Sequence, residues 1–239
     1  MCGRFGLANG KQAFEKFGEL GQMEIFGEVY DLLPRYNASP MSKMPVVAVR
    51  NKKLVAQGMR WWLIPPWSKD GKPVYSAFNA KAETIDKSGL FARFFKSSRC
   101  LIPADAFYEW MKVRVETEVK GKNKEVIEKI PYAIRMKDEE PFMFAGLFSV
   151  WKDKEEKEFP SFTIITTTPN KLMSKIHNRM PVILPEKHFA EWLDRDFKDT
   201  AVLKKLLVPY PTTKMEAYRV SKMVSNARND VPECLDPID

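Results

Sequence analysis

The second residue, in Met1-Cys2-Gly3-Arg4-Phe5, is a cysteine whose position could give it unusual chemistry. If Met1 is removed, Cys2 carries an α-amine and a thiol, which ordinarily titrate at about pH 8 and about 8.5 and are partly nucleophilic at neutral pH. Such a 1,2-aminothiol condenses with an aldehyde to an imine and then to a thiazolidine ring, which an internal cysteine cannot do. Alternatively, Cys2 is a small buried hydrophobic residue, as many free cysteines are.

Two ionisable residues lie in contexts that suit proton transfer. Glu109 is flanked by two aromatic residues. Burial would raise its pKa toward the range useful for acid–base catalysis, whereas simple strand alternation would point it at water. His177 lies at the expected end of a helix, where histidine commonly acts as an electrostatic cap. The sequence supports no role for His188.

Two asparagines complete the set of candidate polar residues. Asn37 lies in the segment 35–40, which has the composition of a turn before a strand, where asparagine usually satisfies its own backbone. Asn79 follows an apolar stretch and has the alternative role of a helix N-cap, although Glu83 is slightly late for a capping box. Taken separately, none of these clusters matches a nucleotide-binding loop, a GxSxG elbow or a metalloprotease helix.

Composition limits the classes of function. The 239 residues include 16 Phe and 6 Trp, enough for a substantial core, and the net charge of +8 favours a polyanionic partner. The 3 cysteines, widely spaced and odd in number, form neither a disulfide framework nor a zinc pattern, so we expect no metal and no cofactor. No signal peptide or membrane span is expected, and a reducing cytoplasm would keep a thiol available.

Hydrophobic patterning predicts more strands than helices. Expected strands are 46–49, 54–59, 132–136, 142–151, 161–167 and 217–221. An exposed hairpin is expected from 113–120 and 124–130 around Gly121-Lys122-Asn123. Helical spacing is found at Phe14, Phe17 and Leu20, at Phe91, Phe94 and Phe95 after Ser88, at Phe189, Trp192 and Leu193, and at Leu172 with Ile176. Because the order is not a regular β-α alternation, we predict an α+β fold. It forms a single domain over 1–239, with an antiparallel, barrel-like sheet and flanking helices.

In combination, these segments resemble the SRAP (SOS response-associated peptidase) family, whose members include an abasic-site shield protein. The matching pieces follow the same order along nearly the whole chain. They are Met1–Phe5, Arg35-Tyr36-Asn37 with Pro40, Trp61 through Trp67, Asn79-Ala80, Ala104-Asp105 with Phe107 through Trp110, Ile176-His177 with Arg179 and Pro181, and Val220-Ser221 with Asn226.

The resemblance implies covalent capture of abasic sites in single-stranded DNA, possibly at junctions with duplex, as a thiazolidine DNA–protein crosslink. Cys2 would be the nucleophile, Asn79 would position the amine or the sugar hydroxyl, Glu109 would move protons, and His177 would assist ring opening and reversal. The expected DNA-binding residues are Arg4, Arg35, Asn37, Pro40, Trp67, Lys81 and Arg179. The resemblance also implies a monomer in the cytoplasm, associated with the nucleoid when on DNA.

Two positions depart from the family pattern, and two other functions stay open. Trp62 replaces the usual glycine of a Trp-Gly-Leu-x-Pro-x-Trp run. Lys81 replaces an arginine and keeps its charge, but a lysine lacks the guanidinium fork that binds a phosphate through two hydrogen bonds. One alternative is an N-terminal-nucleophile cysteine peptidase, with His177 as base and self-removal of Met1. The other is a non-covalent single-stranded DNA-binding protein, favoured by charge and aromatic content.

Overall fold

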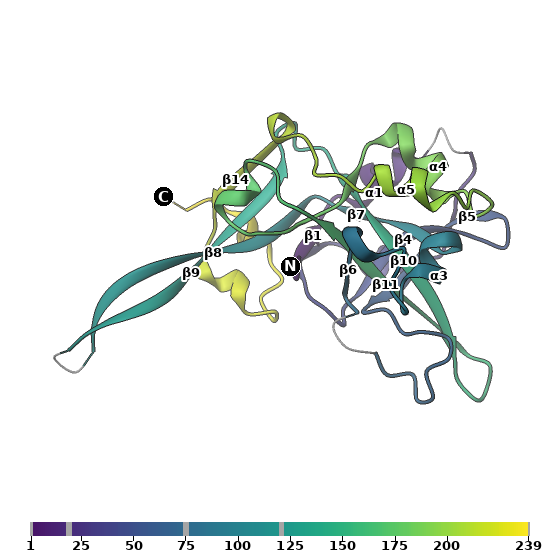
Figure 1. Cartoon of the computed structure of the whole chain (residues 1–239), viewed down its shortest axis with the longest axis horizontal. Coiled ribbons are helices and arrows are strands. Elements are labelled where there is room, and N and C mark those ends of the chain that lie inside the picture. The colour runs from purple at the N-terminus through teal and green to yellow at the C-terminus, as the bar shows by residue number, and fades with distance from the viewer. Residues whose placement is uncertain (1, 18–20, 74–76, 120–121, 239) are drawn as a thin grey trace.

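A computed structural model of the chain describes residues 2–17, 21–73, 77–119 and 122–238 (Figure 1). Five strands form a closed barrel: β4 (Lys43–Arg50), β5 (Lys53–Trp61), β7 (Arg99–Ala104), β10 (Phe142–Lys152) and β11 (Glu158–Thr167). Neighbouring strands are antiparallel except β11 and β5, which pair in parallel and close the barrel. Closure leaves these strands without a long free edge.

Four short strands attach to the barrel and extend its sheet. They are β2 (Glu24–Ile25), β6 (Asn79–Lys81), β12 (Met180–Pro181) and β13 (Ile183–Leu184). β6 pairs in parallel with the end of β11, and β12 pairs antiparallel with the same strand. Thr166 therefore has Lys81 and Pro181 as its two cross-strand partners. This arrangement brings the segment of Asn79 close to the segment that follows His177.

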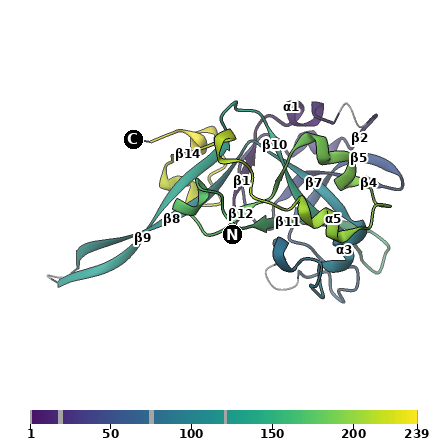
Figure 2. The ribbon, with the colours of Figure 1, turned by 45° about the horizontal axis from the view of Figure 1, so that its top comes forward.

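A second antiparallel sheet carries the N-terminal strand. Its order is β14 (Met215–Arg219), β9 (Lys122–Met136), β8 (Ala106–Val119), β1 (Phe5–Leu7) and β3 (Arg35–Ala38). The long β8–β9 hairpin extends well beyond the rest of the molecule in both views (Figures 1 and 2). The root of this hairpin pairs with β1, so the sheet links the N-terminus to Glu109.

The helices are short and lie around the barrel. They are α1 (Gly10–Glu15), α2 (Glu28–Asp31), α3 (Ala92–Ser97), α4 (Phe189–Leu193) and α5 (Thr200–Lys205). The side chains of Asn9 and Asp199 accept backbone hydrogen bonds at the starts of α1 and α5, which satisfies donors that a helix leaves open. No helix in the described ranges is long and apolar enough to cross a membrane.

One hydrophobic core joins the barrel to the second sheet. Trp61 is fully buried and stacks on Phe162 with ring centroids 6.2 Å apart. Phe5 packs edge-on against Trp61 at 5.0 Å and against Phe144 at 5.6 Å. Burying a phenylalanine contributes about 1.5–3 kcal/mol. Phe5 therefore anchors the N-terminal strand, three residues after Cys2.

The structure confirms most of the predicted strands and the α+β fold. The strands expected at 46–49, 54–59, 132–136, 142–151 and 161–167 lie within β4, β5, β9, β10 and β11. The predicted helical segments at Phe91–Phe95 and Phe189–Leu193 correspond to α3 and α4, and the Ser88 hydroxyl accepts from the Phe91 N–H at 3.2 Å.

Several local predictions were wrong or need adjustment. The strand expected at 217–221 is β14 at 215–219, because its register is set by pairing with β9. Leu172 and Ile176 flank only a 3-10 helix, Met173–Lys175. The segment 35–38 is the strand β3, not a turn, because it pairs with β1 over a long sequence distance. Leu20 and Gly121 lie outside the described residues.

Candidate active site

Glu109 and His177 face each other at the root of the β8–β9 hairpin. The His177 Nε2 and Glu109 Oε2 atoms are 3.9 Å apart. The Arg179 backbone N–H donates to His177 Nδ1 at 3.1 Å. Nδ1 also lies 3.3 Å from the Arg179 carbonyl oxygen, so these contacts fit either tautomer of the neutral ring, and in both the Nε2 atom faces Glu109. The pair is therefore oriented for proton exchange.

Burial shifts the pKa values of the two groups in opposite directions. It raises the pKa of the Glu109 carboxyl to about 7 and lowers the pKa of the His177 imidazole below its ordinary value of 6.5. Glu109 does lie in a strand, but the alternative in which it points at water is wrong, since only 3% of the residue is exposed. A carboxyl group that titrates near neutral pH can serve as both acid and base.

Cys2 lies in register with this pair. β1 pairs Phe5 with Phe107 and Gly6 with Ala106, and the Tyr108 N–H donates to the Arg4 carbonyl at 3.0 Å. Continuing this antiparallel register places Gly3 opposite Glu109, so that Cys2 lies next to the acid–base pair.

The thiol of Cys2 is held in its protonated form by its surroundings. The residue is fully buried, as the alternative expectation for this cysteine stated, and its Sγ lies 4.0 Å from the Arg4 carbonyl oxygen. Burial first, and then the charge of Glu109, raise the pKa of the Cys2 thiol well above its ordinary value. A nearby base must therefore accept the proton when the sulfur reacts.

Asn79 has an unused acceptor. It opens β6 and is not a helix N-cap, because its backbone pairs with Ile164 of β11. Its amide nitrogen donates to the Phe78 carbonyl at 2.8 Å, while its Oδ1 is buried and makes no hydrogen bond within the described part of the chain. Buried polar atoms of this kind are rare and often mark functional positions. The role of Asn79 toward the amine or sugar stays a prediction.

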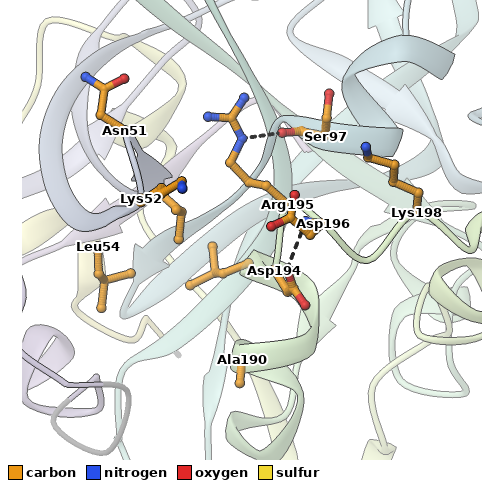
Figure 3. Close-up of a pocket in the computed structure, with 11 residues that line it drawn as sticks. Asn51, Lys52, Leu54, Ser97, Ala190, Asp194, Arg195, Asp196 and Lys198 are labelled. Carbon is orange, nitrogen blue, oxygen red and sulfur yellow. Dashed lines mark hydrogen bonds between the residues drawn. The ribbon is translucent and has the colours of Figure 1, made fainter.

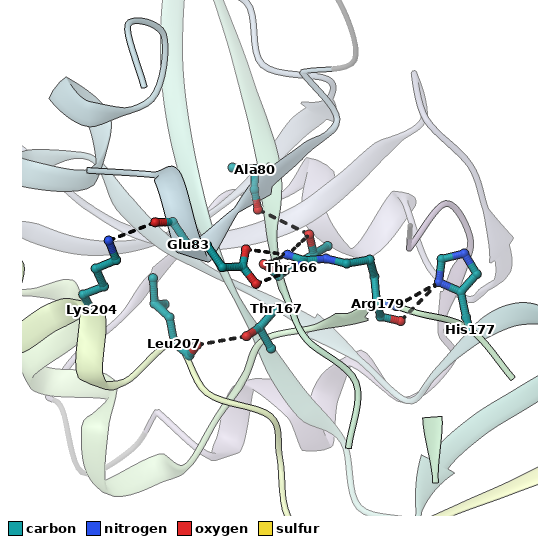
Figure 4. A network of polar contacts seen from close by, with 8 residues as sticks. All are labelled: Ala80, Glu83, Thr166, Thr167, His177, Arg179, Lys204 and Leu207. Atoms are coloured by element: carbon teal, nitrogen blue, oxygen red, sulfur yellow. Dashed lines mark hydrogen bonds and ion pairs between the residues drawn. The ribbon is translucent and has the colours of Figure 1, made fainter. Parts of the chain in front are cut away.

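Arg179 ties the His177 segment to β11 and to Glu83 (Figure 4). Its guanidinium forms a bidentate pair with the Glu83 carboxylate at 2.6 and 2.9 Å and donates to the Thr166 carbonyl at 2.6 Å. The guanidinium hydrogen bonds lower the pKa of Glu83. Since the Arg179 backbone also binds His177, this network fixes the imidazole. DNA contact by Arg179 stays a prediction and would compete with Glu83.

Arg4 and Asn37 hold the C-terminal segment against the N-terminal strand. Arg4 donates to Asn37 Oδ1 at 2.9 Å and to the carbonyls of Val224 and Ser225 at 2.8 and 3.0 Å. The buried Asn37 amide donates to three carbonyls of the segment 224–229, at 2.7 to 3.2 Å. Asn37 does not satisfy its own backbone, as a turn residue would. Both residues have structural roles here, and their DNA contacts stay predictions.

Replacing Asn37 with alanine should destabilise the protein by about 2–4 kcal/mol, because several buried partners lose their hydrogen bonds at once. Chemical denaturation measures the loss, and amide hydrogen exchange in 224–230 should accelerate. Asn226→Ala is the matched control, because that side chain is exposed. Equal stabilities of the two variants would contradict this structural role of Asn37.

The remaining expected DNA-binding residues lie on the surface in different settings. Arg35 forms an ion pair with Asp230 at 2.7 Å, and Pro40 is half-buried. Trp67 is half exposed, stacks on Phe94 and has the Arg93 guanidinium over its ring at 4.7 Å. Lys81 is exposed at the end of β6. Trp67 presents a flat ring beside a cation, as contacts with unstacked bases require.

Trp62 occupies a backbone conformation typical of glycine. Its φ is +156°, where side chains are disfavoured, which gives a physical reason for the glycine expected there. Its ring packs against Phe78 with centroids 5.1 Å apart. The substitution therefore adds an aromatic contact next to Asn79.

Two cavities of the protein differ in the chemistry of the residues that line them. One of about 380 Å³ is lined by Glu109, Trp110, Lys112, Lys129, His177 and Ser225. A larger one of about 780 Å³ lies between the β4–β5 turn and the ends of α3 and α4 (Figure 3). Its charges are mixed, and Arg195 donates to the Ser97 carbonyl at 2.8 Å. The first cavity holds the acid–base pair and is the candidate site.

Sequence patterns missed several residues that shape this site. Asp230 accepts the backbone N–H groups of Tyr36 and Asn37 and pairs with Arg35, and Glu83 holds Arg179. Only long-range contacts reveal these roles. Lys112 and Lys129 were also missed, because Lys112 lies outside the hairpin expected at 113–130 and only the observed register places it opposite Lys129.

The fold and the arrangement of this site define one family. The chain belongs to the SRAP family, because the family model described as SOS response associated peptidase (SRAP) matches residues 1–227. The predicted resemblance is thereby confirmed.

Individual relatives agree with this assignment. The chain is 38% identical over 236 residues to the abasic site processing protein YoqW of Bacillus subtilis (strain 168), with 99% of each chain covered. It is 31% identical over 235 residues to the abasic site processing protein HMCES of Pongo abelii, covering 86% of this chain and 66% of the relative. A solved protein of Bacteroides thetaiotaomicron has a similar fold, with a TM-score of 0.78, 26% identity and coverage of 99% and 100%.

Proposed function

We propose that this protein captures abasic sites in single-stranded DNA as a covalent thiazolidine through Cys2, after removal of Met1. The observation that carries the proposal is the pair formed by buried Glu109 and half-buried His177 beside the N-terminal strand. Relatives named abasic site processing proteins, at up to 39% identity over nearly the whole chain, support the substrate class. An abasic site in its ring-opened form offers the aldehyde that a 1,2-aminothiol requires.

The reaction would proceed in two condensation steps. The α-amine of Cys2 attacks the aldehyde carbon, and one amine proton passes to the carbonyl oxygen, which becomes a hydroxyl. Protonated Glu109 gives its proton to this hydroxyl, which leaves as water, and the Glu109 carboxylate takes the second amine proton, so that a neutral imine forms. The thiol sulfur then adds to the imine carbon, while its proton passes through Glu109 to the ring nitrogen. The buried thiol and the carboxyl that titrates near pH 7 fit this sequence, because neither step requires a free thiolate.

The other polar residues would position the sugar. His177, neutral near pH 7 and with its Nε2 toward Glu109, would help open the sugar ring and reverse the crosslink. The unused Oδ1 of Asn79 would accept a hydrogen bond from the amine or from a sugar hydroxyl. Lys81, Trp67 and Arg179 would bind the strand on either side.

A peptidase reading has less support from this site. A cysteine peptidase needs a thiolate or a base committed to the thiol, whereas burial raises the pKa of the Cys2 thiol and the imidazole faces Glu109. The same residues suit aldehyde condensation, in which the amine reacts first.

The test combines intact mass with a denaturing gel. The purified protein should have the mass of the chain without Met1. Mixed with an abasic single strand, it should gain the mass of the DNA less one water and shift on the gel, while intact DNA gives no shift. Binding that ignores abasic sites would select the non-covalent alternative, and steady peptide turnover without a DNA adduct would select the peptidase.

A further inference from the structure

The β8–β9 hairpin places two lysines directly opposite each other at the edge of the candidate site. The antiparallel register pairs Lys112 with Lys129, and both residues are exposed. Both line the cavity that also contains Glu109 and His177. Opposite residues on one face of such a pair have Cβ atoms about 4.5–5.5 Å apart, and like charges there are destabilising.

No neighbouring carboxylate relieves this repulsion. Neither Lys112 nor Lys129 forms an ion pair with any residue in the described ranges. The adjacent positions on the same face of the two strands carry no acidic residue; they are Trp110, Arg114, Ile127 and Pro131. The positive charge of the lysine pair is therefore uncompensated within the hairpin.

The same hairpin does compensate a like-charged pair farther from the site. Glu116 lies opposite Glu125, and Arg114 forms a diagonal ion pair with Glu125 at 3.3 Å. The acidic pair is therefore compensated by an ion pair, whereas the lysine pair, which lies in the part of the hairpin next to the candidate site, is not. An external anion is the simplest partner for it.

We propose that Lys112 and Lys129 clamp a backbone phosphate of the DNA strand next to the nucleotide that reacts with Cys2. This inference rests on the proposed function, since it assumes that DNA enters the cavity. Two ammonium groups can flank the oxygens of one phosphate, which removes the repulsion between them.

The surroundings of the lysine pair favour a DNA strand over an isolated anion. Trp110 precedes the pair along β8 and lines the same cavity, and Ile127 beyond it is 63% exposed. Cations alternating with a flat ring and an apolar side chain match the repeat of phosphates and unstacked bases in a single strand. The charge of Lys112 also acts on His177, which places the clamp within electrostatic reach of the chemistry.

The test separates binding from crosslinking. A single-stranded oligonucleotide with a tetrahydrofuran residue in place of the abasic sugar has no aldehyde, so fluorescence anisotropy reports binding alone. The variant Lys112→Ala/Lys129→Ala should bind roughly tenfold more weakly at low salt. Its plot of log K against log salt should lose a slope of about 0.7 for each phosphate contact removed.

A matched control removes the same charge elsewhere. Lys52→Ala/Lys198→Ala takes two lysines from the cavity of Figure 3, at the opposite end of the molecule from the hairpin (Figure 1). This control should keep the wild-type slope. Thermal unfolding should show no loss of stability in the hairpin variant, because a repulsive pair has been removed.

Each outcome bears on one proposal. An unchanged slope in the hairpin variant, or an equal loss in the control, would overturn the clamp. If the wild type never crosslinks but its binding still depends on the lysines, the proposed function fails and the clamp stands.

Discussion

Replacing Cys2 with alanine should abolish the covalent product with abasic DNA entirely, because alanine keeps an α-amine but has no sulfur to close the ring. At most a reversible imine would form, which a denaturing gel does not retain. Cys2→Ser should behave in the same way unless borohydride is added, which reduces the imine to a stable amine. Intact mass spectrometry with and without borohydride separates the amine step from the thiol step.

The chain supplies its own control for this experiment. Cys100 and Cys234 are also fully buried free thiols. Neither follows the initiator methionine, so neither can present an α-amine. Cys100→Ala and Cys234→Ala should crosslink at the wild-type rate. A crosslink that persists in Cys2→Ala, or that vanishes in Cys100→Ala, would remove Cys2 from its proposed role.

The sequence predicted the elements of the barrel because their patterns are local. Runs such as Val46–Val49 and Phe142–Trp151 are apolar over the length of a buried strand, and β4 and β10 contain them. The sequence predicted a barrel-like sheet but not how the barrel closes. The parallel contact between β5 and β11 that closes it joins residues about a hundred positions apart.

The short strands were missed for a related reason. β3 and β6 contain three or four residues each, and their polar members look like turn or cap residues. Pairing with β1 and β11 overrides these local preferences. The same pairing places Asn37 against the C-terminal segment and Asn79 beside β11, so a single cause explains why both local structures were assigned wrongly.

The candidate site shows the limit of residue types as predictors. Glu109 and His177 were identified and do lie together, 3.9 Å apart. Arg4 was expected to face DNA, yet three of its hydrogen bonds go to the chain itself. The guanidinium of an arginine can donate to phosphate, carboxamide and carbonyl oxygens alike. Only the position of the C-terminal segment, more than two hundred residues away, decides among them.

Glu109→Gln should slow crosslink formation by about 10²–10⁴-fold, the usual contribution of a positioned general acid–base. Glutamine keeps the shape of the side chain but exchanges no proton. The wild-type rate should change with pH around 7, where the carboxyl titrates, and this inflection should be absent in the variant. Rapid-quench time courses at pH values from about 5 to about 9, on both sides of this titration, measure both effects. Glu116→Gln, on the exposed part of β8, should leave rate and profile unchanged.

The same variant should be more stable than the wild type above neutral pH. The pKa of Glu109 rises from an ordinary 4.5 to about 7 on folding, so the folded state binds this proton more tightly than the unfolded state does. The contribution of this tighter proton binding to the free energy of unfolding is fully present below pH 4.5 and is lost as the pH rises through about 7. At about 1.4 kcal/mol for each pKa unit, burying the ionised carboxylate costs roughly 3 kcal/mol at high pH. Glu109→Gln should recover that amount at alkaline pH and almost none in acid, as urea denaturation at both extremes would measure.

A variant that is slower but equally destabilised at every pH would instead have lost a structural contact. In that case the rate defect would not identify Glu109 as the acid–base group.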